Sequence, residues 1–211
     1  MISIEKRDFL FRFVPTLIRN NLQLDEEALY STTDQVTADK ITNEILKYIP
    51  KTSIITDATA CIGGTSYSFM QVFDYVIAIE LNEQRFKFLI NNINELKKIK
   101  YSSSINIENI KCVHGDALIE CKKQWQDAIF IDPPWGGPEY KMLDKVSLKL
   151  SNIELSTACE EISKYTRFII LKVPVNFDEN IFLENTKHFM NLIHKNEHLR
   201  KIHLLIFEIK I

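Results

Sequence analysis

The chain has 211 residues, of which 45% are hydrophobic and 26% are charged. This length suits one domain, and this composition excludes a disordered chain. A formal net charge of −2 argues against broad, charge-driven binding along a nucleic-acid backbone, which usually needs a basic surplus.

Other exclusions come from the distribution of residues along the chain. No apolar run approaches the roughly 20 residues of a membrane span, and the charged start lacks the apolar core of a signal peptide. We therefore expect a soluble, intracellular protein with no membrane partner. No metal site or disulfide framework is expected, because the histidines do not stand at ligand spacing and the cysteines lie far apart, at positions Cys61, Cys112, Cys121 and Cys159.

Residues 1–50 are predicted to form a short helical cover. Thr33 or Asp34 can cap a helix, and its apolar stripe consists of Val36, Ile41, Ile45 and Ile49. About fifty residues make a poor core on their own. We therefore expect this segment to pack on a domain formed by residues 51–211.

From Ser53 onward, short apolar runs alternate with longer amphipathic ones, which is typical of a parallel sheet with crossover helices. Strands are predicted at residues 53–57, 75–80, 110–113, 128–131 and 168–173, and helices at residues 65–73 and 82–99. The tail from Lys187 is predicted as two antiparallel strands that turn near Asn196 and Glu197. The fold class is therefore α/β, with a mostly parallel sheet and a C-terminal antiparallel hairpin.

Polar residues gather where the predicted strands end, and ligands of open parallel sheets bind at that edge. Each residue alone could be a turn or a cap. Together they favour a nucleoside ligand, since Glu80 follows Gly63 by 17 residues and can accept both hydrogen bonds of a ribose diol. Because Gly63 and Gly64 form no GxGxxG motif, S-adenosylmethionine, which has no pyrophosphate, is favoured over a dinucleotide. Asp116 is placed to bind the adenine amine, and Asp57 to lie near the sulfonium or its amino group.

The most specific element is the run Asp132-Pro133-Pro134-Trp135. Prolines stiffen the backbone and remove donors, so the Pro133 carbonyl is left to accept a hydrogen bond. With Asp132, it could bind the two protons of a planar exocyclic amine. Trp135 supplies an aromatic face for the ring that carries the amine, although a tight turn with a buried tryptophan is the alternative.

These residues resemble a known family. The (D/N/S)PP(Y/F/W) signature is that of S-adenosylmethionine-dependent methyltransferases acting on exocyclic amines. The longer PPWGGPxY string is similar to the cap hypermethylases, or trimethylguanosine synthases, and the resemblance spans roughly residues 24–211. Matching segments are residues 25–33, 57–64, 76–80, 91–92, 115–116 and 174–176. The resemblance implies a Rossmann-like class I methyltransferase fold with a seven-stranded sheet.

The resemblance also implies an activity: methylation of the 2-amino group of a 7-methylguanosine RNA cap to di- or trimethylguanosine. Trp135 would stack on the methylated guanine, with Asp132 and Pro133 completing the catalytic motif. Implied cofactor-binding residues are Thr33, Asp57, Gly63, Gly64, Glu80, Asp116 and Asp132. Implied substrate-binding residues are Trp135, Asn92, Tyr140 and Asn176.

Three positions depart from the family pattern: Asp132 stands in place of Ser, Asp34 in place of Pro, and Val175 in place of Arg. Val175 cannot make the contact to cap phosphates that an arginine would make. Two alternatives stay open. The first is a guanine or adenine amine methyltransferase that acts on ribosomal or other structured RNA. The second is a non-catalytic subunit that binds capped RNA or a partner protein.

Overall fold

The structure, a computed structural model, describes residues 4–99, 108–199 and 201–210. The chain forms two compact units, of which the first ends at Gly115 and the second begins at Asp116. The division predicted at residue 50 falls within the first unit and stays a prediction.

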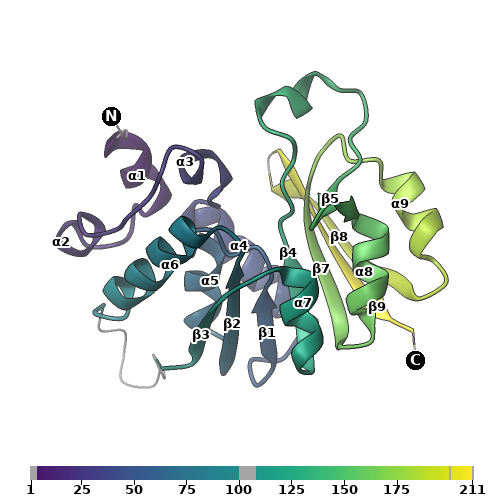
Figure 1. Ribbon diagram of the computed structural model, residues 1–211, viewed down its shortest axis with the longest axis horizontal. Helices are drawn as coiled ribbons and strands as arrows, with labels where there is room; N and C mark the ends of the chain where they lie inside the picture. Colours follow the sequence, from purple (N-terminus) through teal and green to yellow (C-terminus); the bar gives the residue numbers. More distant parts are fainter. Residues whose placement is uncertain (1–3, 100–107, 200, 211) are drawn as a thin grey trace. The chain divides into compact units, whose positions relative to one another are not determined.

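The first unit contains three parallel strands, in the order β3-β2-β1 (Figure 1). Its elements are α1 (Ile4–Leu10), α2 (Thr16–Arg19), α3 (Ala28–Ser31), α4 (Gln35–Ile45), β1 (Ile54–Asp57), α5 (Gly64–Met70), β2 (Tyr75–Glu80), α6 (Glu83–Leu96) and β3 (Ile110–His114). Helix α5 packs against β1 and β2, and α6 packs against β2 and β3. The strand β2 lies at the bounds predicted for it.

Helix α4 begins where the sequence indicated. Of the two candidate caps, Asp34 is the one observed, because its side chain accepts hydrogen bonds from the Thr37 backbone N–H and hydroxyl. Ile41 and Ile45 of the predicted stripe are fully buried, and α4 packs against α5. The stripe therefore forms part of the core of the first unit.

In the second unit, the strands of the larger sheet follow the order β4-β7-β9-β8. Its elements are α7 (Ala117–Glu120), η1 (Cys121–Lys123), β4 (Gln126–Ile131), η2 (Pro138–Met142), β5 (Lys149–Leu150), β6 (Ile153–Glu154), α8 (Leu155–Ser163), β7 (Thr166–Pro174), α9 (Glu179–Thr186), β8 (Met190–Leu199) and β9 (Ile202–Ile209). Strands β4 and β7 are parallel, whereas β9 is antiparallel to both β7 and β8. The small strands β5 and β6 form a separate two-stranded hairpin.

The C-terminal hairpin forms as predicted, but its predicted turn is wrong. Strand β8 continues through Asn196 and Glu197 to Leu199, and Asn196 pairs with Leu204. The register shifts between Asn196 and Leu199, which is a β-bulge, and the Asn196 side chain accepts a hydrogen bond from the His198 backbone N–H. Polar residues that suggested a turn therefore mark a bulge within the strand.

The predicted fold class is confirmed. Seven strands are mostly parallel, helices follow most of them along the chain, and the last two strands form an antiparallel hairpin. Within the described part of the chain, no helix is long and apolar enough to cross a membrane.

The cap of α4 gives a test of the fold. Replacing a capping Asp by Ala removes the acceptor for the first helical turn and costs about 1 kcal/mol, whereas Asn retains most of the effect. We expect Asp34→Ala to lower the free energy of unfolding in urea by about 1 kcal/mol, and Asp34→Asn to lower it by about half of that or less. Equal midpoints for Asp34→Ala and the wild type would contradict the capping role.

Candidate active site

In the first unit, the turn after β1 brings Thr33 against the glycine pair. Gly63 has a φ of +97°, a left-handed conformation that glycine adopts without strain, at the N-cap of α5. A Cβ on Gly64 would lie 2.5 Å from the Thr33 carbonyl oxygen and 2.6 Å from Thr32 Cγ2. Gly64 therefore allows the segment before α4 to approach the start of α5.

Glu80, at the end of β2, is held by the same turn. Its Oε2 accepts a hydrogen bond from the Cys61 backbone N–H at 2.9 Å, and its Oε1 accepts one from the Asn82 backbone N–H at 2.7 Å. Arg85 Nε lies 3.7 Å from Oε1. A carboxylate has about four lone-pair sites, so this buried group keeps capacity to accept from a ligand hydroxyl.

Asp57, at the end of β1, is 1% exposed. Ser66 of α5 donates its hydroxyl to Asp57 Oδ2 at 2.6 Å, and the Thr59 backbone N–H donates to Oδ1 at 3.4 Å. These bonds compensate a charge that is otherwise costly to bury. The carboxylate thus has a fixed position between β1 and the start of α5.

Asn92, on α6, is a structural link in this fold. Its Oδ1 accepts from the Gln23 and Asn91 donors, and its Nδ2 donates to the Gln23 and Ile62 carbonyls. The side chain is fully buried, and these four bonds use every donor and acceptor of the amide. The Asn92 amide therefore ties the N-terminal cover to the turn after β1, and the substrate contact expected of this residue stays a prediction.

Asp116 caps α7 at the start of the second unit. Its Oδ1 accepts from the Leu118 backbone N–H at 2.8 Å and from the Ser151 hydroxyl at 2.7 Å. Ser151 and Asn152 both have positive φ, of 51° and 67°, and form the two-residue turn between β5 and β6. The small hairpin therefore contributes to the orientation of Asp116.

Asp132 follows β4 directly and is paired with a lysine of the neighbouring strand. Ile131 of β4 lies opposite Leu171 of β7, and Lys172 Nζ donates to Asp132 Oδ2 at 2.6 Å. The Lys172 and Asp132 side chains are only 9% and 14% exposed. Burial raises the pKa of Asp132, although the Lys172 ammonium and, more weakly, the Trp135 indole N–H lower it.

The rest of the motif places an aromatic ring beside this pair. Pro133 is buried and Trp135 is partly buried. The Tyr140 ring meets Trp135 edge-to-face, with 5.2 Å between centroids and 82° between planes. Within the described residues, the buried Trp135 indole nitrogen makes no hydrogen bond of good geometry, so its proximity to Asp132 amounts to a weak electrostatic contact.

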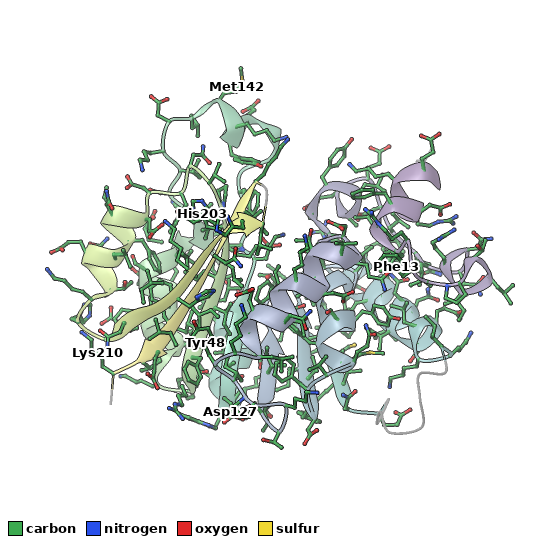
Figure 2. The ribbon with its side chains drawn as sticks, turned by 180° about the vertical axis from the view of Figure 1, so that it is seen from behind. Phe13, Tyr48, Asp127, Met142, His203 and Lys210 are labelled. Atoms are coloured by element: carbon green, nitrogen blue, oxygen red, sulfur yellow. The ribbon has the colours of Figure 1, made fainter. Side chains whose placement is uncertain are left out.

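Asn176 anchors the loop that carries the motif. Its Nδ2 donates to the Tyr140 and Leu143 carbonyls at 2.8 and 2.7 Å, while its buried Oδ1 has no partner among the described residues. Val175, beside it, is 52% exposed. Met142, at the tip of the loop, points away from the unit (Figure 2) and is 87% exposed.

Several residues of the site were missed by the sequence analysis because they act through the predicted ones. Ser66, Ser151 and Lys172 each bind one predicted carboxylate. Serines give no distinctive sequence signal. Lys172 does give one, since it is a charged residue in an otherwise apolar strand.

Burial raises the pKa of all four cysteine thiols. Burial raises the pKa of Cys61 and Cys121 to about 12 and that of Cys112 to about 11, so these thiols stay protonated at neutral pH. Among the described residues, no group of three or more His, Cys, Asp or Glu could hold a metal ion.

The residues of the first unit fit the ribose part of S-adenosylmethionine. The observation that supports the fit is the Glu80 carboxylate, buried and fixed by two backbone donors beside the turn that carries Gly63 and Gly64. A fixed acceptor of this kind suits a ribose diol.

Comparisons with known proteins identify the family. A family model described as RNA cap guanine-N2 methyltransferase matches residues 52–205. An uncharacterised protein of Acanthamoeba polyphaga mimivirus is 30% identical over 194 residues, which cover 81% of this chain and 73% of that protein. The trimethylguanosine synthase of Schizosaccharomyces pombe is 26% identical over 161 residues, 74% of this chain and 64% of the enzyme. For the Saccharomyces cerevisiae enzyme the identity is 24% over 170 residues, 76% of this chain and 50% of the enzyme.

Solved structures support the fold. A TehB-like S-adenosylmethionine-dependent methyltransferase from Corynebacterium glutamicum superposes with a TM-score of 0.58 at 12% identity, covering 87% of this chain and 93% of that chain. A precorrin-6y C5,15-methyltransferase from Geobacter metallireducens superposes with a TM-score of 0.55 at 13% identity, covering 90% of this chain and 94% of that chain. The fold is thus the Rossmann-like methyltransferase fold, and the chain belongs to the RNA cap guanine-N2 methyltransferase family.

Proposed function

We propose that this chain methylates the exocyclic 2-amino group of a 7-methylguanosine RNA cap, giving di- or trimethylguanosine. The observation that carries the proposal is the motif after β4, where a paired Asp132 carboxylate lies beside the partly exposed Trp135 ring. Family membership supports an RNA cap guanine substrate, and the two yeast relatives are trimethylguanosine synthases. The chain spans only 64% and 50% of those two enzymes.

In the proposed cofactor site, Glu80 accepts the ribose hydroxyls and Asp57 lies toward the positively charged end of the ligand. Asp116 accepts from the adenine amine, and Thr33 approaches beside the Gly63-Gly64 turn. S-adenosylmethionine supplies a methyl group that its sulfonium makes electrophilic. The supporting geometry is that each of the three carboxylates is already held by a protein donor.

Trp135 is proposed to select the methylated guanine. A 7-methylguanine ring is cationic, and a cation over a tryptophan face gains about 0.5–2 kcal/mol. Since about 1.4 kcal/mol is a factor of ten in affinity, stacking can favour 7-methylguanosine over plain guanosine by about tenfold. Tyr140 holds the indole by its edge contact, so the ring plane is set before a substrate arrives.

The Asp132 carboxylate and the Pro133 carbonyl are proposed to accept hydrogen bonds from the two N–H groups of the guanine amine. Among the described residues, no donor reaches the Pro133 carbonyl, which is consistent with this role. The amine is a weak nucleophile because its lone pair is delocalised, and orienting it toward the methyl group supplies most of the rate gain. The Asp132 carboxylate also offsets the positive charge that develops on nitrogen, and the proton then leaves to solvent or to Asp132.

A second candidate function is methylation of an adenine or unmodified guanine amine in structured RNA. Asp132 favours it, because an aspartate at this position resembles enzymes with those substrates. The net charge of −2 argues against it, since such enzymes usually need extra basic surface for RNA contacts. A non-catalytic subunit is disfavoured by the intact carboxylates, and would fail to bind S-adenosylhomocysteine.

Glu80 provides a test of the cofactor site. Glu80→Ala removes both carboxylate oxygens, which are held by backbone N–H groups in the wild type. We expect the affinity for S-adenosylhomocysteine, measured by calorimetry, to fall by about tenfold or more. The matched control is Glu83→Gln, on the exposed first turn of α6, where Glu83 pairs with Lys87. We expect this control to bind as the wild type does. Equal affinities for Glu80→Ala and Glu83→Gln would place the cofactor elsewhere.

Trp135 provides a test of the nucleobase site. We expect Trp135→Ala to reduce methyl transfer to 7-methyl-GTP by about a hundredfold or more, because stacking and orientation of the base are both lost. Its affinity for S-adenosylhomocysteine should stay within about threefold of wild type. Trp125, the other tryptophan, is 56% exposed just before β4, and Trp125→Ala should be fully active. Near-normal activity of Trp135→Ala would disprove the stacking role.

A further inference from the structure

Lys172 is an unusual residue for its position in the second unit. It lies within β7, whose residues from Phe168 to Pro174 are all buried, and it is 7% exposed. Strand β7 is hydrogen-bonded to β4 on one side and to β9 on the other, with Lys172 opposite Leu204. Lysines are almost never buried to this extent unless they are paired, so this ammonium needs a specific partner.

The partner is the first residue of the methyltransferase motif. The Lys172 ammonium donates to Asp132 Oδ2 at 2.6 Å, which is the short distance typical of a charge-assisted hydrogen bond. It also lies over the Trp135 ring, 5.3 Å from the centroid. One buried cation thus contacts both motif side chains that are proposed to meet the substrate.

The pairing has a consequence for the charge of Asp132. Burial favours the protonated form of this carboxyl, and the Lys172 ammonium opposes that effect. A protonated carboxyl would present an O–H donor where the amine needs an acceptor. The ammonium therefore preserves the acceptor, and by binding Oδ2 it also restricts rotation of the carboxylate.

Resting on the proposed function, we propose that Lys172 is a positioning residue, which holds Asp132 as an oriented carboxylate acceptor for the nucleobase amine through the Nζ–Oδ2 hydrogen bond. It acts on the substrate through Asp132 and does not itself contact the reacting atoms. The pair is neutral in sum, so it adds no net charge beside the cationic base and the cationic cofactor.

The other titratable groups near β7 face away from the Lys172–Asp132 pair or pair with other residues. His203 of β9 (Figure 2) lies opposite Val173, on the face of the strand opposite to Lys172. Burial lowers the pKa of His203, and its charged neighbours are Lys195, Glu197 and Glu179. On α8, which packs against β7, Glu160 and Glu161 are exposed and pair with His188 and Lys122. At the start of β7, Arg167 pairs with Glu208.

The experiment compares wild type, Lys172→Met, Lys172→Arg, Asp132→Asn and the double variant Asp132→Asn with Lys172→Met. Methyl transfer from S-adenosylmethionine to 7-methyl-GTP is measured for kcat and KM across mildly acidic to mildly alkaline pH. We expect Lys172→Met to lower kcat at neutral pH by about tenfold or more, with KM changed by less than about threefold. Its activity should rise with pH along an acid limb that lies about one unit or more above that of wild type.

The double variant separates positioning from a merely structural role. An asparagine oxygen accepts a hydrogen bond without titrating, so this variant should regain about tenfold in kcat over Lys172→Met and lose the shifted acid limb. Lys172→Arg keeps the cation and should be more active than Lys172→Met. The matched control is Lys195→Met, since Lys195 pairs with Glu179 and Glu197 outside the motif, and we expect its kcat and pH profile to equal those of wild type.

Unfolding in urea gives a second readout that needs no activity. Without Lys172, folded Asp132 binds its proton more tightly, whereas in the unfolded chain the carboxyl ionises at its ordinary pKa. The difference in the free energy of unfolding between wild type and Lys172→Met should therefore increase as pH rises. It should not increase between Asp132→Asn and the double variant.

The outcomes distinguish this inference from the proposed function. If wild type is active on 7-methyl-GTP and Lys172→Met matches it in kcat and pH profile, the positioning role is overturned and the function stands. If the folded double variant is as impaired as Lys172→Met and keeps its shifted acid limb, Asp132 is not the group through which Lys172 acts, and the positioning role is also overturned. If wild type methylates none of the nucleotide probes while the difference in the free energy of unfolding increases as expected, the function is contradicted and the pairing is supported.

Discussion

A carboxylate buried at the end of a strand must be bound by a donor, and this constraint organises both units of the molecule. Asp57, Glu80 and Asp132 each end or directly follow a strand, where a charge is costly to bury unless it is hydrogen-bonded. Donors of three kinds bind these carboxylates: a serine hydroxyl binds Asp57, two backbone N–H groups bind Glu80, and a lysine ammonium binds Asp132. Because each donor comes from another element, satisfying the charge also fixes the turn, helix or strand that supplies it.

Residues that bind none of these carboxylates hold the same turns and loops in place. The turn after β1 approaches Thr33 because Gly64 has no side chain, and Asn92 ties that turn to the N-terminal cover. In the second unit, Asn176 holds the motif loop by two backbone carbonyls. Their common effect is preorganisation, which lowers the conformational entropy lost when a ligand binds.

Much of the fold could be predicted from sequence, because apolar periodicity reports directly on burial. The bounds of β2 and the cap of α4 are local properties, and both were predictable. The turn of the C-terminal hairpin was not, since Asn196 and Glu197 have the composition of a turn but lie in a bulge. A bulge depends on the register between two strands, and a single strand's sequence does not contain that register.

For the candidate site, the sequence predicts the residues themselves but not the partners that hold them. Its carboxylates, glycines and motif follow from spacing and resemblance, while their partners follow from tertiary contacts. Lys172 could have been noticed as a charge in an apolar strand, but its pairing with Asp132 requires the register of β4 and β7. Asn92 shows the opposite case, since a residue that matches a family position is fully occupied by hydrogen bonds within the protein.

The most direct measurement offers the protein labelled S-adenosylmethionine with 7-methyl-GTP, GTP and ATP in parallel reactions, and locates any transferred methyl group by mass spectrometry. The account predicts transfer to the 2-amino group of 7-methyl-GTP, at least about tenfold faster than to GTP, and no transfer to ATP. Preferred methylation of GTP or ATP, or the absence of transfer to all three by protein that binds S-adenosylhomocysteine, would contradict it.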